Sequence, residues 1–376
     1  MRIGVPAETT AGETRVAVTP ETAKKIIAQG HQVLIQSGAG LAASVTDAAY
    51  ETVGAQITDA AGALGAELVL KVRAPSSKEL GHMTSGAALV GMLNPFDADG
   101  LQRLASAGLT SFALEAAPRT TRAQSMDVLS SQANIAGYKA VMEAANQYQR
   151  FFPMLMTAAG TVKAARVVIL GVGVAGLQAI ATAKRLGAVI EASDVRPSVK
   201  EQVESLGAKF IDVPYETAEE KEAAEGVGGY ARPMPQSWLD RQKIEVAKRV
   251  ALANVVISTA LIPGRAAPVL ITEDMVKSMK PGSVIVDLAA GKGANGVGGN
   301  CPLTETDQTV VKHGVTLVGD SNLPARVAAD ASALYARNVL DFLKLVLPKD
   351  KGFTVDMEDD IVAACLMTQG GEVKRK

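Results

Sequence analysis

The segment Arg166–Asp194, RVVILGVGVAGLQAIATAKRLGAVIEASD, decides the fold of this chain. It begins with the apolar, mostly β-branched run Val167–Leu170, which is typical of a buried parallel strand. The run leads into Gly171, Gly173 and Gly176 at G-x-G-x-x-G spacing. In this pattern the first glycine permits a tight turn, the second lets the backbone approach a pyrophosphate, and the third lets the helix pack closely on the strand. The segment therefore predicts a dinucleotide-binding βαβ unit.

The residues after the glycine turn agree with this prediction. Gly176–Leu186 is predicted to be a small-residue helix that ends at Gly187, and Val189–Ser193 is predicted to be the next strand. Asp194 follows at the end of that strand, where an acidic residue binds the adenosine ribose. Because a carboxylate there repels the 2′-phosphate of NADP, we expect NAD(H) at this site.

Two alternatives stay open at this point. Arg196 provides a guanidinium that accommodates a 2′-phosphate, stacks on adenine or lies in solvent. A G-x-G-x-x-G pattern is also weak on its own in a chain with 35 glycines, so the second alternative is a doubly wound sheet that binds no nucleotide.

Length and composition fit two α/β domains of ordinary size. A chain of 376 residues can build two cores, and 48% hydrophobic residues with only 4% aromatic ones are typical of helix-covered parallel sheets. The formal net charge of −1, from 38 basic and 39 acidic residues, gives no field that would gather a nucleic acid backbone. We therefore expect no nucleic acid partner.

Cysteine and histidine are too sparse for a disulfide framework or a metal site. The two cysteines are isolated and the three histidines lack metal-ligand spacing, so we expect no metal and a reducing cytoplasm. The start MRIGVP lacks the apolar core of a signal peptide. Neither uncharged stretch of the chain fits a membrane span, because one is broken by polar residues and glycines and the other is the strand and helix described above.

Strands and helices are predicted to alternate on both sides of Asp127–Arg150, which has few helix breakers and is predicted to be one long helix. On its N-terminal side the alternating elements are Arg2–Val5, Pro20–Gln29, Gln32–Gln36, Asp47–Thr52, Ile57–Ala63, Leu68–Val72, Ala87–Leu93 and Leu109–Leu114. On its C-terminal side further strands are expected at Lys209–Val213, Val255–Thr259, Val284–Leu288 and Thr316–Gly319, and helices at Ser198–Leu206, Ser237–Ala253 and Thr272–Met279. This alternation predicts parallel sheets.

These elements define the expected architecture. We predict an α/β protein with two Rossmann-like, doubly wound domains joined by the long helix, with a nucleotide cleft between them. The first domain is expected to comprise residues 1–133 and 320–376, because an alanine-rich helix at Ala328–Leu347 is predicted to return to it. Residues 134–319 are the expected NAD(H)-binding domain.

Two segments interrupt the alternation. Glu216–Gln236 combines charge, glycine and two prolines, and it is predicted to be a mobile functional loop, favoured as a lid, or a disordered insertion. Gly291–Asn300 is rich in glycine and follows a late strand, so it either faces the nucleotide crevice or is a flexible connector.

Motifs along essentially the whole chain resemble the soluble NAD(H)-binding domain I subunit of the proton-translocating nicotinamide nucleotide transhydrogenases, in its split bacterial form. The most specific of them is RTTRAQSMDVLSSQANIAGY at 119–138. The others are RVA at 15–17, MTAAGT at 156–161, GVGVAGLQAIATAKRLGA at 171–188, DVR at 194–196, KEQVESLG at 200–207, GGYA at 228–231, TALIPG at 259–264, GGNCPL at 298–303 and RVAADAS at 326–332.

The resemblance implies that Arg119, Gln124 and Asp127 surround the nicotinamide, with Ser130 beside them. Hydride transfer moves two electrons and a proton as one unit, so positioning of the ring matters more than acid–base catalysis. The alternative is a solvated charge cluster at a helix start, with Ser125 as the cap.

The resemblance also implies contacts to the nucleotide outside the three glycines. Three of these residues belong to a loop that closes over the bound nucleotide in that family, namely Gly229, Tyr230 and Met234. The remaining implied contacts are Val174, Asp194, Val195, Arg196, Gln242 and Leu261.

The partners implied by the resemblance are protein chains. They are a second copy of this chain in a homodimer, a separate domain III that holds NADP(H), and a membrane-embedded domain II through which hydride transfer is coupled to proton translocation. Such a chain is expected to lie in the cytoplasm, peripheral on the inner face of the membrane, and to be inactive or nearly so alone.

A weaker resemblance to the alanine dehydrogenases gives an alternative function. Arg15 and Lys71 match residues that bind the amino-acid or keto-acid substrate there. However, Asn94 stands at the place of the expected histidine, and AGKG at 290–293 stands where those enzymes carry a catalytic aspartate. The segment GKGANGV at 291–297 is also a few residues longer than in the transhydrogenase pattern. A non-catalytic NAD sensor is the third alternative.

Overall fold

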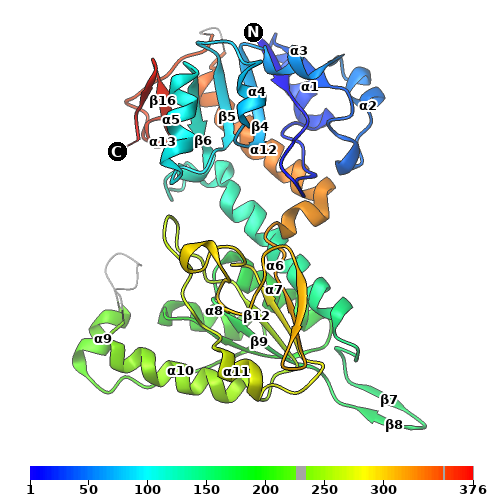
Figure 1. The fold of residues 1–376 in the computed structure, drawn as a ribbon, viewed down its shortest axis with the longest axis vertical. Coiled ribbons are helices and arrows are strands. Elements are labelled where there is room, and N and C mark those ends of the chain that lie inside the picture. Colours follow the sequence, from blue (N-terminus) through cyan, green and yellow to red (C-terminus); the bar gives the residue numbers. More distant parts are fainter. Residues whose placement is uncertain (226–233, 350–351, 376) are drawn as a thin grey trace. The chain divides into compact units, whose positions relative to one another are not determined.

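The computed structural model describes residues 1–225, 234–349 and 352–375 and divides into two compact units (Figure 1). Unit 1 consists of Met1–Gln132 and Pro324–Lys376, and unit 2 consists of Ala133–Leu323. The chain leaves unit 1 within the helix α6 (Val128–Gln147), which lies where one long helix is predicted, and it returns through the short 3₁₀ helix η6 (Leu323–Val327).

Unit 1 is built on an eight-stranded sheet in the order β17-β16-β6-β5-β4-β1-β2-β3. The six strands from β6 to β3 are parallel to their neighbours and form a doubly wound arrangement, while β16 and β17 add antiparallel strands at one edge. The strands are β1 (Arg2–Val5), β2 (Gln32–Gln36), β3 (Gln56–Thr58), β4 (Leu68–Arg73), β5 (Ala88–Met92), β6 (Thr110–Ala113), β16 (Leu366–Gln369) and β17 (Glu372–Val373).

Helices cover both faces of the sheet in unit 1. Residues of α1, α12 and α13 pack with one set of strand residues, while residues of α3 and α5 pack with the other set. The predicted return of the alanine-rich helix to the first domain is confirmed, because α12 contributes Tyr335, Phe342 and Val346 to this core. The helices are α1 (Pro20–Ala28), α2 (Asp47–Thr52), α3 (Ala60–Leu64), α4 (Ser77–Leu80), α5 (Ala98–Ser106), α12 (Ala328–Val346) and α13 (Asp360–Cys365), with 3₁₀ turns η1 (Leu41–Ala43), η2 (Leu114–Ala116) and η3 (Gln124–Met126).

Unit 2 is built on a seven-stranded sheet in the order β11-β10-β9-β12-β13-β15-β14. The six strands from β11 to β15 are parallel, and the strand order reverses between β9 and β12. In open sheets of this kind, ligands bind at such a switch point, outside the carboxyl ends of the strands. The strands are β9 (Arg166–Leu170), β10 (Val189–Ser193), β11 (Lys209–Phe210), β12 (Val255–Ser258), β13 (Val284–Asp287), β14 (Thr309–Lys312) and β15 (Val315–Val318).

Alternate strand residues of unit 2 pack against helices on opposite faces of its sheet. Val167, Ile169 and Ile257 pack with residues of α6, α7 and α8, whereas Val168 and Val256 pack with residues of α10 and α11. The helices are α7 (Val174–Arg185), α8 (Lys200–Ser205), α9 (Ala218–Glu225), α10 (Gln236–Val250) and α11 (Glu273–Ser278), with 3₁₀ turns η4 (Pro197–Val199) and η5 (Ala294–Gly296). The predicted fold class, with two doubly wound α/β domains, is therefore confirmed.

Several local elements differ from the sequence prediction. The segment 216–236 is not a loop throughout, because 218–225 forms α9; the remaining part at 226–233 lies outside the described residues. β11 is only two residues long where five are predicted, because Asp212 and Pro214 follow it. The antiparallel edge strands β14, β16 and β17 are not predicted, and neither is the two-stranded hairpin of β7 (Leu155–Thr157) and β8 (Gly160–Val162) that projects from unit 2 (Figure 1).

The longest described helices are α6 and α12, with 20 and 19 residues. Neither of them, nor any other helix in the described ranges, is both long and apolar enough to cross a membrane.

Candidate dinucleotide-binding site

The glycine turn connects β9 to α7 at the switch point of the sheet in unit 2. Gly171 has a φ of +91°, in the left-handed region that favours glycine, and its N–H donates to Ser193 O at 2.9 Å. A Cβ at Gly176 would collide with the Gly171 carbonyl oxygen, so this glycine permits the close packing of helix on strand. Gly173 differs from both, because a Cβ there would meet no protein atom within 4 Å.

The N-terminus of α7 is open to an anion. Gly173 is its N-cap and provides no side chain that would bind the first backbone N–H groups. These groups and the positive end of the helix dipole attract the negative charge of a diphosphate. The open space at Gly173 and the uncapped helix start therefore fit the diphosphate of a dinucleotide.

Asp194 and Arg196 form a fork-like ion pair at the end of β10. The Asp194 carboxylate accepts hydrogen bonds from Arg196 Nε at 2.9 Å and Nη2 at 3.0 Å, and from Val172 N at 2.7 Å. The hydrogen bond to Asp194 raises the pKa of the Arg196 guanidinium. Since the carboxylate already engages this guanidinium, a 2′-phosphate would have to displace Asp194 before it reached Arg196.

Gln242 joins this group from α10. Its Nε2 donates to Ser193 Oγ and to Asp194 O, both at 3.2 Å. The structure thus brings Gln242 and Asp194 together, although they lie far apart in the sequence, and this contact fixes the end of β10. Val174 and Val195 are exposed in the same part of the unit, in the turns after β9 and β10.

The other implied nucleotide contacts of unit 2 are placed differently. Leu261 is exposed in the segment that follows β12. Met234 is buried and packs with Val213 and Trp238 in a small apolar cluster. Gly229 and Tyr230 lie outside the described residues.

Arg119, Gln124, Asp127 and Ser130 lie in unit 1, in and around η3 and the start of α6. Arg119 and Gln124 are exposed. The Asp127 carboxylate accepts hydrogen bonds from Ser130 N at 2.8 Å and from Ser130 Oγ at 2.5 Å. It therefore caps the start of α6, the role for which Ser125 is the sequence-based alternative; that choice of cap is wrong.

Two side chains that the sequence analysis does not single out hold this segment within unit 1. Arg122 Nη1 donates to Asp359 Oδ2 at 2.6 Å, in front of α13. Asn338 of α12 donates from Nδ2 to Ser125 O at 2.7 Å and accepts from Ser131 Oγ at 2.7 Å. Asn338 belongs to a helix about 200 residues further along the chain, so local sequence patterns carry no signal for this contact.

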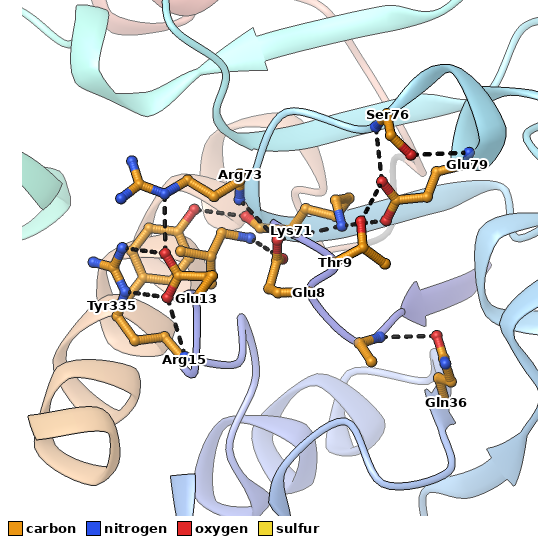
Figure 2. A network of polar contacts seen from close by, with 12 residues as sticks. Glu8, Thr9, Glu13, Arg15, Gln36, Lys71, Arg73, Ser76, Glu79 and Tyr335 are labelled. Atoms are coloured by element: carbon orange, nitrogen blue, oxygen red, sulfur yellow. Dashed lines mark hydrogen bonds and ion pairs between the residues drawn. The ribbon is translucent and has the colours of Figure 1, made fainter. Parts of the chain in front are cut away.

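Arg15 and Lys71, the residues behind the alternative function, belong to a polar network in unit 1 (Figure 2). The Arg15 guanidinium donates to both carboxylate oxygens of Glu13, at 2.7 and 2.6 Å. The Lys71 ammonium donates to Glu79 at 2.7 Å and lies 3.3 Å from Glu8. Both cationic side chains are buried, and carboxylates of the same unit balance their charges.

The carboxyl edge of the sheet in unit 2 also contains a buried pair that the sequence analysis does not single out, Asp287 and Asn300. Asp287 ends the buried strand β13 as Asp194 follows the buried strand β10, so a carboxylate after an apolar run is the signal that was available. Asn300 lies in the GGNCPL motif, where neighbouring glycines give no indication of burial.

Comparisons with known proteins agree with this geometry. The model of the alanine dehydrogenase/PNT N-terminal domain matches residues 4–136, and that of the alanine dehydrogenase/PNT C-terminal domain matches residues 140–376. The first of the two alpha chains of the NAD(P) transhydrogenase of Rhodospirillum rubrum is 49% identical over 99% of this chain and 97% of its own length. A crystal structure of transhydrogenase from Sinorhizobium meliloti is 46% identical, with a TM-score of 0.89 over 99% of this chain and 100% of that one.

The similarity to alanine dehydrogenases is lower. The alanine dehydrogenase of Halomonas elongata is 30% identical over 99% of this chain and 94% of its own length. Family, fold and glycine turn together imply a nicotinamide nucleotide as the ligand. The chain belongs to the alanine dehydrogenase/PNT family, and within it is more similar to these transhydrogenase alpha subunits than to this alanine dehydrogenase.

Proposed function

We propose that this chain is the NAD(H)-binding subunit of a proton-translocating NAD(P)⁺ transhydrogenase, and that hydride passes directly between NADH on this chain and NADP⁺ on a separate domain III. The observation that carries the proposal is the open glycine turn at Gly173 with Asp194 at the end of the next strand, in a chain that is 49% identical to a transhydrogenase alpha subunit over nearly its whole length. The bound NADH supplies the hydride when it is present.

The residues of the chain would bind and orient the nucleotide. Backbone N–H groups at the start of α7 would hold the diphosphate, and Asp194 would bind the adenosine ribose. Gln124 would hold the carboxamide through its donor and acceptor, while Arg119 and Asp127 would fix the ring or its ribose. Ser130 donates to Asp127 and would keep that carboxylate in place.

Val174, Val195, Arg196, Gln242 and Leu261 would complete the binding surface of unit 2. Gly229, Tyr230 and Met234 would belong to a segment that closes over the nucleotide and excludes water. Such closure matters most for a reaction in which two nicotinamide rings must be held together.

A self-sufficient amino-acid dehydrogenase is the less favoured function, because it needs groups that move protons. Asn94, at the place of the expected histidine, carries an amide that does not titrate. Gly291, at the place of the catalytic aspartate, has a φ of +73°, and a Cβ there would meet Thr306 at 3.0 Å. A carboxylate at that position would be strained as well as crowded.

The test of the proposal mixes the purified chain with a cognate domain III and follows reduction of an NADP⁺ analogue by NADH. We expect transfer only when both proteins are present, because each would hold one of the two nucleotides. Absence of transfer with both nucleotides bound would contradict the proposal. Alanine-dependent reduction of NAD⁺ by the chain alone would favour the dehydrogenase, and tight binding without either reaction would favour an NAD sensor.

Changing the ring-positioning residues is expected to lower transfer more than binding. Gln124→Ala removes the amide, and Asp127→Asn removes the charge but retains a side chain that can cap α6. We expect transfer with domain III to fall about tenfold or more, while the Kd for NADH changes less than threefold. Single-turnover transfer and NADH titration measure the two quantities, and unchanged transfer in both variants would show that these roles are wrong.

We also propose a homodimer, supported by the hairpin of β7 and β8. A two-stranded hairpin without a third strand is marginally stable in water, and its Met156 side chain is 75% exposed. We expect Met156→Lys to shift the chain from dimer to monomer in sedimentation, whereas Val311→Lys, at a position 65% exposed on the edge strand β14, should leave the mass unchanged. A wild-type chain that sediments as a monomer would contradict this part of the proposal.

The remaining partners follow from the proposed activity. Domain III would hold NADP(H), and domain II would span the membrane and couple hydride transfer to proton translocation. The chain would then lie on the cytoplasmic side, peripheral to the inner face of the membrane and attached through these subunits.

A further inference from the structure

A buried carboxylate organises the loops at the carboxyl edge of the sheet in unit 2. The Asp287 side chain, at the end of β13, accepts hydrogen bonds from five neutral donors. The donors are Ala289 N at 3.0 Å, Asn300 N at 3.2 Å, Cys301 N at 2.9 Å, Ser258 Oγ at 3.1 Å and Thr304 Oγ1 at 2.9 Å. A buried carboxylate that satisfies so many donors fixes the backbone that supplies them.

Asn300 extends this arrangement to the segment after β12. Its Nδ2 donates to Ala260 O at 2.9 Å and to Pro268 O at 2.8 Å, and its Oδ1 accepts from Ala260 N at 3.1 Å. The side chain thus takes the place of a neighbouring strand for Ala260. Because Asn300 is fully buried, water cannot replace these bonds when they are lost.

The same segment is tied to the glycine turn on its other side. Thr259 Oγ1 donates to Gly171 O at 2.8 Å, and the exposed Leu261 follows two residues later. A continuous set of bonds therefore runs from Asp287 through Asn300 and Ala260 to the turn at Gly171. It fixes the main chain next to Leu261 without using any exposed side chain.

This geometry also gives a place to the longer glycine-rich segment. Gly291 N donates to Gly298 O at 2.8 Å, and Ala267 N donates to Lys292 O at 2.7 Å. The two ends of the segment are held at Asp287, while Val297 in its middle is 70% exposed. The additional residues therefore extend into solvent and leave the fixed ends in register.

We infer that Asp287 and Asn300 are positioning residues that set the main chain at Ala260 and Leu261 for the nicotinamide half of NAD(H). The adenosine half depends instead on the glycine turn and Asp194, which this pair touches only through Thr259. The inference rests on the proposed function, and it predicts that loss of the pair weakens one half of the dinucleotide contact selectively.

The test compares NADH with ADP-ribose, which has the same diphosphate and adenosine but no nicotinamide. Asn300→Asp keeps the shape of the side chain but cannot donate to Ala260 O or Pro268 O, and it places a second carboxylate beside Asp287. We expect the Kd for NADH to rise about tenfold or more, from two lost hydrogen bonds, and the Kd for ADP-ribose to change less than threefold. Calorimetric titration of the full chain measures both.

A milder variant and a matched control accompany this change. Thr304→Val removes one of the donors to Asp287 and is expected to raise the Kd for NADH about threefold while leaving ADP-ribose unaffected; it carries the test if Asn300→Asp does not fold. Val297→Ser, in the exposed middle of the same segment, should change neither Kd.

The outcomes separate this inference from the proposed function. Equal weakening of both ligands, or unchanged NADH binding in a folded variant, would overturn the inference alone. A wild-type chain that bound neither ligand would overturn the proposed function and the inference with it.

Discussion

Replacing Gly173 with Val is expected to abolish NADH binding and to leave the stability of the chain unchanged. A Cβ at this position meets no protein atom within 4 Å, and the φ of −81° is one that any residue adopts. The free protein therefore has room for the valine. The side chain would occupy the space that we assign to the diphosphate, so its cost falls on the complex alone.

The matched variant for this prediction is Gly176→Ala. Its methyl group would collide with the Gly171 carbonyl oxygen, so we expect overpacking to destabilise unit 2 by about 1–3 kcal/mol. Trp238, the only tryptophan in the chain, lies in unit 2 and reports its unfolding by fluorescence. Gly173→Val protein that binds NADH like the wild type would show that the diphosphate lies elsewhere, and Gly176→Ala protein with wild-type unfolding would show that helix and strand tolerate separation.

Replacing Glu13 with Gln is expected to cause the second large effect, a loss of about 3 kcal/mol in the stability of unit 1 near pH 7. Burial raises the pKa of this carboxyl, but hydrogen bonds and charge from Arg15, together with the charge of Arg73, outweigh burial and lower the pKa to about 2. Glutamine keeps the size of the side chain and removes the charge. Arg15 would then be buried without its counterion.

The pH dependence gives this prediction a sign. Because the folded-state pKa of about 2 lies below the ordinary value of 4.5, the charge of Glu13 stabilises unit 1 fully above about pH 5. This contribution is lost as the pH falls toward 2, so the difference between wild type and Glu13→Gln should shrink over that range. Hydrogen exchange of peptides from β1 and β4 measures it, with unfolding of unit 2 at Trp238 as the internal control. A difference that stayed constant down to pH 2 would contradict the assignment.

The local patterns of the sequence predict much of the fold because the main-chain geometry of a βαβ unit depends on neighbouring residues. Val189–Ser193 is a strand with the predicted bounds, and the alternation of strands and helices gives two doubly wound sheets. The antiparallel strand β16 escapes prediction because its pairing with β6 joins residues about 250 apart in the chain, and no local period encodes that partner.

The candidate site divides in the same way. The glycines, Asp194 and the segment around Gln124 are recognisable from spacing and from resemblance. The contact of Gln242 with the end of β10, the anchoring of Ser125 by Asn338, and the pair Asp287 and Asn300 emerge only when helices and loops pack.

The sequence by itself determined the class of fold, the glycine turn and the preference for a carboxylate at the end of β10, because each depends on side chains that act within about thirty consecutive residues. Only the tertiary structure decided what each charge faces. It joined Arg196 to Asp194, buried Arg15 with Glu13, and placed Asn300 between two loops. Electrostatic energies and hydrogen bonds depend on distance in space and on burial, which a linear pattern does not contain.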